Sequence, residues 1–254
     1  MRSARALLLA EWTKIRSVRS TVWTLITAFV VTVLTSTVIA AVYNNQFDSL
    51  SAKQKADFDP TNLGFIGVQL GQLVLVVFAV LVVCSEYTTR TVRYSLMAVP
   101  RRGAFLAAKL TVATALVLVT SMATAFTTFG IAQSIFGARG ASLGDPGVAR
   151  AVVGAGLYMT LITLLAMGLS AVLRSPMLSL GVLMPFFFLV SPILTTVPRI
   201  RTAARFLPDQ AGGLVTHVRT SGWPFGPWAG LAILCGWTAA LVLAGYLTLR
   251  RRDA

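Results

Sequence analysis

Six long apolar segments constrain this chain more than any other feature of its sequence. An α-helix needs roughly 20 apolar residues to cross the hydrocarbon core of a bilayer, which is about 30 Å thick. The segments that reach this length lie at about 22–43, 63–84, 106–136, 148–173, 177–197 and 228–249. The sequence therefore predicts an all-α, polytopic membrane protein with six transmembrane helices. We expect residues 1–254 to form one transmembrane domain, because the connections are too short to hold cores of their own.

The third apolar segment is longer than a bilayer requires. A helix over 106–136 must tilt, protrude from the membrane, or break near Gly130. These three outcomes stay open at the level of the sequence.

Composition supports the bilayer as the solvent for most of the chain. Only 12% of the 254 residues are charged and 56% are hydrophobic, whereas soluble domains carry roughly 25% charged residues. The net charge of +14 does not indicate a nucleic-acid partner, because the basic residues lie between the apolar segments or at their ends rather than on one soluble face. They suit contact with lipid headgroups and a role in topology.

Fourteen of the 22 lysine and arginine residues gather on one side of the predicted membrane helices. They occupy the N-terminal stretch, the connection after the second segment, the turn after the fourth, and the C-terminus. These are Arg2, Arg5, Lys14, Arg16 and Arg19, then Arg90, Arg93, Arg101, Arg102 and Lys109, then Arg174, and finally Arg250, Arg251 and Arg252. The positive-inside rule places both termini in the cytoplasm. Because Ala, Arg and Val are frequent, we expect a bacterial plasma (inner) membrane.

The N-terminal segment at about 4–19 is short and charged, yet apolar residues recur in it at helical spacing. The apolar residues are Leu8, Trp12 and Ile15, and the charged ones include Glu11 and Lys14. This pattern predicts an interfacial elbow helix, with the apolar stripe against lipid and Glu11 and Lys14 toward water or headgroups. The alternative is a disordered basic tail.

The connection between the second and third segments carries a distinct polar pattern. Its notable residues are Glu86, Arg90, Thr91, Arg93, Leu96, Pro100, Arg101 and Arg102. Glu86 and Arg90 are four residues apart, which favours an ion pair on a helix. A short amphipathic helix that ends near Pro100 would present Leu96 for docking. An ordinary basic loop fits the connection equally well.

Two groups of polar residues lie inside apolar segments. Gln69 and Gln72 share a face of the second, and Thr120, Thr124 and Thr127 form a stripe along the third. Both groups are candidates to line a path for a substrate. Hydrogen bonds between helices are the favoured alternative, at roughly 0.6 kcal/mol each.

Catalytic and metal-binding patterns are missing from the sequence. The chain has one histidine, His217, and two cysteines far apart, Cys84 and Cys235. We therefore expect no metal site and no catalytic site. No acidic residue lies inside an apolar segment, which argues against an ion-coupled transporter.

The order of these features resembles the permease of an ABC-2 type exporter. The resemblance rests on the basic start with Glu11-Trp12-Thr13-Lys14, a second span ending in Glu86, the later Thr91, Pro100, Arg101 and Lys109, and Leu207-Pro208 before the last span. It covers essentially the whole chain, and its specificity lies in order and spacing.

The resemblance implies a permease that forms a path while a separate ABC ATPase binds ATP and Mg. It also implies a second permease, either an identical copy or a similar chain. The connection from Glu86 to Arg102 would dock on the ATPase as a coupling helix. The sequence has no G-x-x-x-x-G-K-[ST] loop to hold a nucleotide. The alternative is a non-transporting membrane protein, such as a channel-like or sensor-anchoring subunit, with no ATPase partner.

Overall fold

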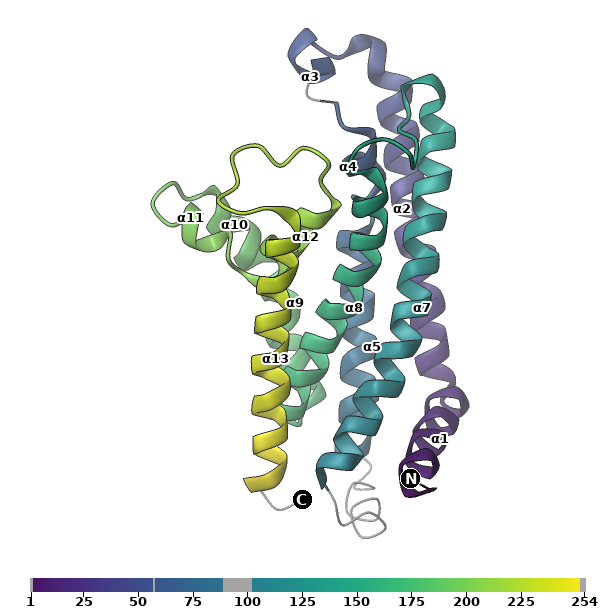
Figure 1. The fold of residues 1–254 in the computed structure, drawn as a ribbon, viewed down its shortest axis with the longest axis vertical. Coiled ribbons are helices and arrows are strands. Elements are labelled where there is room, and N and C mark those ends of the chain that lie inside the picture. Colours follow the sequence, from purple (N-terminus) through teal and green to yellow (C-terminus); the bar gives the residue numbers. More distant parts are fainter. Residues whose placement is uncertain (1, 57, 89–101, 252–254) are drawn as a thin grey trace.

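The chain folds into a bundle of helices (Figure 1). The computed structural model describes residues 2–56, 58–88 and 102–251, and these residues contain no β-strand. The helices are α1 (Arg2–Ser17), α2 (Arg19–Gln46), α3 (Ala52–Ala56), α4 (Pro60–Gly64), α5 (Val68–Thr88), α7 (Arg102–Phe136), α8 (Val148–Leu173), α9 (Pro176–Pro185), α10 (Ser191–Thr196), α11 (Arg201–Ala204), α12 (Pro208–Gly213) and α13 (Pro227–Arg251).

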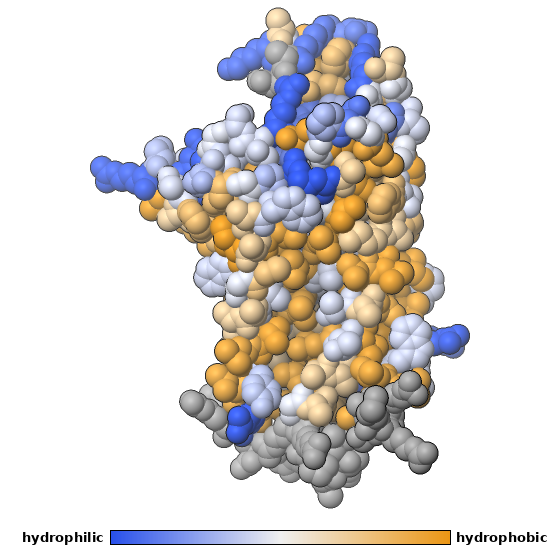
Figure 2. All heavy atoms as spheres, viewed as in Figure 1, coloured by the Kyte–Doolittle hydropathy of each residue, from blue (hydrophilic) through white to orange (hydrophobic). Residues whose placement is uncertain are grey.

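Six helical stretches in the described part of the chain are long and apolar enough to cross a membrane, as the sequence predicted. They are Arg19–Ser49, Pro60–Ser85, Gly103–Arg139, Val148–Leu173, Pro176–Thr196 and Pro227–Arg250. On the face shown in Figure 2, hydrophobic residues cover the middle of the molecule, and hydrophilic residues gather toward the end that carries α3. The chain is therefore a multi-pass membrane protein.

The two ends of the bundle differ in what they carry. Helix α1, the last turn of α5, the first turn of α7 and the C-terminal end of α13 lie at one end, which we call the terminal end (Figure 1). Helices α3 and α4 and the start of α8 lie toward the opposite end. The chain runs up and down between these ends, so the last turn of α5 and the first turn of α7 lie at the same end as α1 and the end of α13.

The third and fifth spans differ in regularity. Helix α7 runs unbroken from Arg102 to Phe136, so the helix does not break near Gly130. The fifth span is interrupted: α9 ends at Pro185, a π-helical turn covers Phe186–Val190, and α10 begins at Ser191. Proline lacks the backbone N–H that a regular helix needs, which accounts for an irregular turn next to Pro185.

Helix α8 is the centre of the bundle and packs against α5, α7 and α13. It is the most buried of the six spans. Its small residues Ala151 and Ala155 are fully buried, which lets neighbouring helices approach closely. Helices α2 and α5 also meet closely, because Gly67 and Gly71 leave room for Thr32 and Ser36.

The segment between α10 and α13 folds back against the bundle rather than forming an open loop. Helix α12 packs on α13 and α8, and the turn Leu214–Thr216 that follows it is buried against α8. Arg150 on α8 holds this turn from one side, because its guanidinium donates hydrogen bonds to the backbone carbonyls of Val215 (3.5 Å) and His217 (3.1 Å). This returning segment builds one wall of the cavity described below.

Candidate functional site

Two polar regions stand out in the apolar bundle. One is a cluster of charged side chains at the terminal end, where α1 meets α5 and α7. The other is a cavity nearer the opposite end, between α5 and the returning segment.

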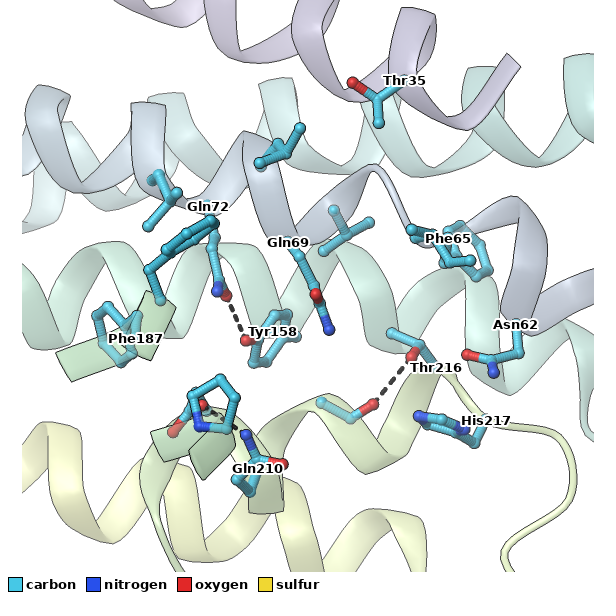
Figure 3. Close-up of a pocket in the computed structure, with 18 of the residues that line it drawn as sticks. Thr35, Asn62, Phe65, Gln69, Gln72, Tyr158, Phe187, Gln210, Thr216 and His217 are labelled. Atoms are coloured by element: carbon cyan, nitrogen blue, oxygen red, sulfur yellow. Dashed lines mark hydrogen bonds between the residues drawn. The ribbon is translucent and has the colours of Figure 1, made fainter. Parts of the chain in front are cut away.

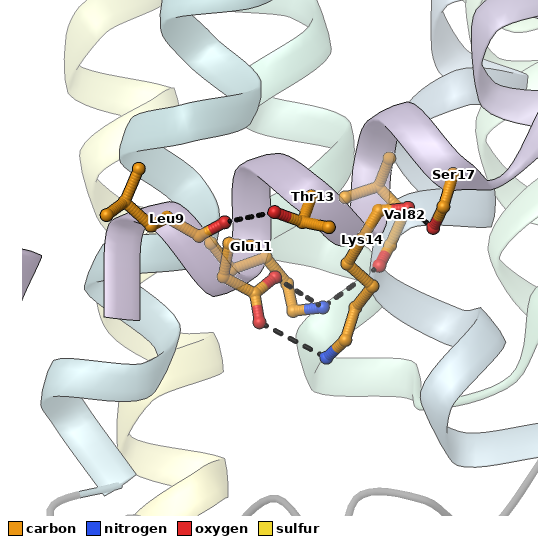
Figure 4. A network of polar contacts seen from close by, with 7 residues as sticks. Leu9, Glu11, Thr13, Lys14, Ser17 and Val82 are labelled. Carbon is orange, nitrogen blue, oxygen red and sulfur yellow. Dashed lines mark hydrogen bonds and ion pairs between the residues drawn. The ribbon is translucent and has the colours of Figure 1, made fainter. Parts of the chain in front are cut away.

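Glu11 on α1 is the centre of the charged cluster (Figure 4). Its carboxylate lies 3.4 Å from the Lys109 ammonium (Oε2 to Nζ) and 3.2 Å from that of Lys14 (Oε1 to Nζ). Lys109 also donates a hydrogen bond to the backbone carbonyl of Val82 at 3.3 Å. One glutamate therefore links α1 to α7, and Lys109 links α7 to α5.

Burial makes this cluster more than a surface ion pair. The Glu11 side chain is 5% exposed and that of Lys109 is 4% exposed. Buried charges are costly unless they are paired, so each of these two residues accounts for the burial of the other. Both lysine ammonium groups also lie near the ring of Phe105, at 5.8 Å for Lys14 and 5.4 Å for Lys109, which adds cation–π attraction.

The orientation predicted for α1 is partly wrong. Leu8 and Trp12 are exposed, as expected of a stripe that faces lipid, but Ile15 is buried. Glu11 was expected to face water, and it points into the protein instead. The reason is that Glu11 and Ile15 are one helical turn apart and share the face that packs on α7. Lys109, a lone lysine inside an apolar helix, was the signal that a buried acidic partner was needed.

The predicted coupling residues lie at the border of the described chain. Arg90, Thr91, Arg93, Leu96, Pro100 and Arg101 are outside the described residues. Glu86 is in the last turn of α5 and Arg102 is the first residue of α7. Val82, whose carbonyl receives the Lys109 hydrogen bond, is one helical turn before Glu86. The charged cluster is therefore next to both ends of the connection.

The cavity has a volume of about 530 Å³ and is bounded by α2, α5, α8, the π-helical turn, and the returning segment (Figure 3). Gln69 and Gln72 point from α5 toward Tyr158 and Gln210, which lie across the cavity. This volume is within the range of pockets that hold drug-sized ligands, about 300–1,000 Å³.

Asp209 on α12 is the acidic group of the cavity. Asp209 is buried, with 6% of its surface exposed. Ser191 donates to its carboxylate at 2.6 and 2.7 Å, and Gln210 donates at 2.8 Å. No basic side chain in the described residues forms an ion pair with it. Burial raises the pKa of Asp209 above its ordinary value, and the hydrogen bonds from Ser191 and Gln210 oppose this shift.

A second hydrogen bond crosses the cavity wall. The Tyr158 hydroxyl on α8 donates to the side-chain carbonyl of Gln72 on α5. Both residues are buried. This bond supports the expectation that polar residues in the second span pair with neighbouring helices, and it also places Gln72 in the lining of the cavity.

Of the other candidates to line a path, only the glutamine lies in this cavity. Gln69 lines the cavity together with Gln72. The hydroxyls of Thr120 and Thr124 donate to carbonyls of their own helix, at 2.9 and 2.7 Å. Thr120 lines a separate and mainly apolar pocket beside α1 and α2, and neither Thr124 nor Thr127 lines either pocket. The threonine stripe and the glutamine pair therefore belong to different parts of the bundle.

Sequence reasoning missed Asp209 as a buried group. It lies in the connection between the apolar segments at 177–197 and 228–249, where no buried polar group was expected. The signal that could have found it is the apolar character around Pro208, where Leu207, Ala211 and Leu214 flank the polar pair Asp209 and Gln210. Within the described ranges, no group of three or more His, Cys, Asp or Glu side chains could hold a metal ion.

The fold and the two polar regions define a six-span helical membrane protein with a polar cavity and a charged cluster at its terminal end. A comparison with protein families matches residues 7–191 to the family described as ABC-2 family transporter protein. The chain belongs to this family of membrane transporter subunits, which have no catalytic activity of their own. No curated protein matches the chain.

Proposed function

We propose that this chain is the membrane permease of an ATP-driven exporter, coupled to a separate ATPase. Family membership over residues 7–191 is the observation that carries the proposal, since this stretch includes the first four spans and most of the fifth. ATP and Mg bind to the partner ATPase. A second permease, either another copy of this chain or a similar one, completes the translocation path.

The coupling route starts at the connection from Glu86 to Arg102. Glu86, Arg90 and Arg93 contact the ATPase, and Leu96 docks beside them. When the ATPase closes on ATP, this connection moves the ends of α5 and α7. The motion follows only if the connection binds the closed and open ATPase states with different affinity.

The charged cluster supports this route by its position. Lys109 touches the carbonyl of Val82 near the end of α5, and it pairs with Glu11 on α1. A displacement at the end of α5 or α7 therefore moves α1 as well, because polar contacts connect the three helices. The elbow helix α1 stabilises the ends of α5 and α7, the two helices that lead to the ATPase.

The orientation follows from charge. The terminal end carries the N-terminal, central and C-terminal groups of basic residues, so we place it in the cytoplasm. The end that carries α3 and α4 then faces outward. In a bacterium this membrane is the plasma membrane. The cavity beside Gln69 and Gln72 lies in the outer half of the path.

Affinity purification tests this proposal directly. The tagged chain is expressed in its native host, extracted in mild detergent, and its co-purifying proteins are counted per permease. We expect an ATPase with a phosphate-binding loop at about one copy per permease. A preparation that transports nothing and retains no ATPase supports the non-transporting alternative instead.

A further inference from the structure

The cavity has an unbalanced charge. Asp209 is buried in it, and the described residues that line it include neither lysine nor arginine. The other lining residues that can titrate are Tyr158 and His217. Burial lowers the pKa of His217, with Asp59 opposing, so this imidazole is neutral at pH 7. Above the pKa of Asp209, the described lining therefore supplies an anion and no fixed cation.

The rest of the lining suits an organic cation. Phe65, Phe187, Phe188 and Trp223 contribute aromatic rings, which attract cations through their faces. Gln69 and Gln210 offer amide groups at the cavity wall. Leu70 and Phe188 are exposed where the cavity reaches the surface of the bundle, so the approach to the polar wall is apolar.

We propose that this cavity binds amphipathic organic cations, with the Asp209 carboxylate as the anchor for the positive charge. A buried carboxylate is costly without a counter-charge, and a bound cation supplies one. Ser191 and Gln210 hold the carboxylate in place from one side, which leaves the cation to approach from the cavity. This inference rests on the proposed transport function, for which it names the class of substrate.

Asp209 and Gln210 lie beyond the stretch matched to the family, which ends at residue 191. Family membership therefore says nothing about this half of the cavity. The proposal depends on the returning segment, which brings residues 209–217 against Gln72 and Tyr158.

Binding of tetraphenylphosphonium to the purified chain in detergent tests the proposal without the ATPase. Tetraphenylborate has the same shape and the opposite charge, so its binding, measured in a separate sample, is the matched control. We expect tetraphenylphosphonium to bind, and Asp209→Asn to weaken this binding at least tenfold. Tetraphenylborate should not bind.

Two further variants make the result decisive. Gln69→Lys places a fixed cation in the cavity at an exposed position, so it should weaken tetraphenylphosphonium binding. It tests the proposal independently if Asp209→Asn folds poorly. Asp48→Asn removes a carboxylate far from the cavity and should leave binding unchanged. Equal binding by wild type, Asp209→Asn and Gln69→Lys, no binding by wild type, or binding of tetraphenylborate as tight as that of tetraphenylphosphonium would overturn the proposal.

The two proposals fail separately. If tetraphenylphosphonium does not bind but an ATPase co-purifies, the transport function stands and the substrate class is wrong. If the cation binds at Asp209 and no ATPase co-purifies, the cation-binding proposal holds and the proposed coupling to an ATPase is wrong.

Discussion

Glu11 on the first helix and Lys109 on the third span form an ion pair buried within the terminal end of the bundle, with Oε2 and Nζ 3.4 Å apart. The two residues are nearly a hundred positions apart in the sequence. Their pairing fixes the elbow helix to the span that follows the proposed coupling connection. In the proposed mechanism, this ion pair makes α1 follow movements of α7.

Glu11→Gln should destabilise the protein because it leaves the Lys109 ammonium buried with less compensation. Loss of one member of a buried pair costs about 3–5 kcal/mol, and Lys14 does not replace the lost charge because it is itself a cation. We expect a lower apparent melting temperature in detergent. The double variant Glu11→Gln/Lys109→Met should recover most of the loss.

The matched control is the exposed pair of Arg139 and Asp48, whose guanidinium and carboxylate are 3.3 Å apart. Exposed pairs contribute little, so Asp48→Asn should leave the melting temperature unchanged. If Glu11→Gln is as stable as Asp48→Asn, the buried pair has no structural role.

Gly67→Ala should weaken the contact between α2 and α5. A methyl group at this position would overlap the backbone carbonyl oxygen of Thr32 and the Ser36 hydroxyl, and a backbone group cannot rotate away. Overpacking of this kind costs about 1–3 kcal/mol.

Gly130→Ala is the control for Gly67→Ala. A methyl group there meets nothing within 4 Å, and alanine favours the helix by about 1 kcal/mol. Thermal unfolding should therefore shift down for Gly67→Ala and stay level or rise for Gly130→Ala. Equal melting temperatures would contradict the close packing of α2 on α5.

The raised pKa of Asp209 predicts a pH dependence of stability. Because burial favours the protonated carboxyl, the folded state binds a proton that the unfolded state releases between the ordinary pKa of 3.8 and the raised value. Stability should therefore increase as the pH falls through the raised pKa toward 3.8.

His217 acts in the opposite direction. Its lowered pKa means that the unfolded chain takes up a proton first, so stability is lost as the pH falls below the ordinary value of 6.5. Comparing wild type with Asp209→Asn isolates the aspartate, since both contain His217. The stability difference between them should change between pH 7 and pH 4, and a constant difference would contradict a raised pKa.

The spans were predictable because apolar length alone identifies a membrane helix. The predicted 148–173 coincides with Val148–Leu173, and the other spans differ from the sequence estimate by a few residues at each end. The irregular turn Phe186–Val190 was harder to predict, because the position of a proline indicates that the helix is interrupted but not the geometry of the interruption.

The polar contacts were less predictable because they join residues far apart in the sequence. The pattern of α1 indicated an amphipathic helix, yet Glu11 turned inward because Lys109 supplies a charge there. Likewise, Tyr158 meets Gln72 only once α8 packs on α5. Asp209 lies in a connection between two apolar segments, and it is buried only because the returning segment packs against the bundle.

Glu86→Ala tests the coupling role of the connection. The variant removes a carboxylate from the last turn of α5. We propose that this carboxylate contacts the ATPase. We expect fewer ATPase copies per permease after purification and a lower ATPase rate, with normal insertion into the membrane. Asp48→Asn, at the opposite end, should match wild type. A Glu86→Ala permease with full ATPase retention and rate would remove Glu86 from the interface.

The central claim is that the connection between α5 and α7 faces the cytoplasm, where an ATPase can reach it. In a chain with Cys84→Ala and Cys235→Ala, single cysteines are placed by Ser95→Cys in the connection and by Leu143→Cys near the start of α8. A membrane-impermeant maleimide is then applied to intact and to permeabilised cells. The account predicts that the cysteine at 143 reacts in intact cells and the cysteine at 95 reacts only after permeabilisation. Labelling at position 95 in intact cells, with position 143 protected, would contradict it.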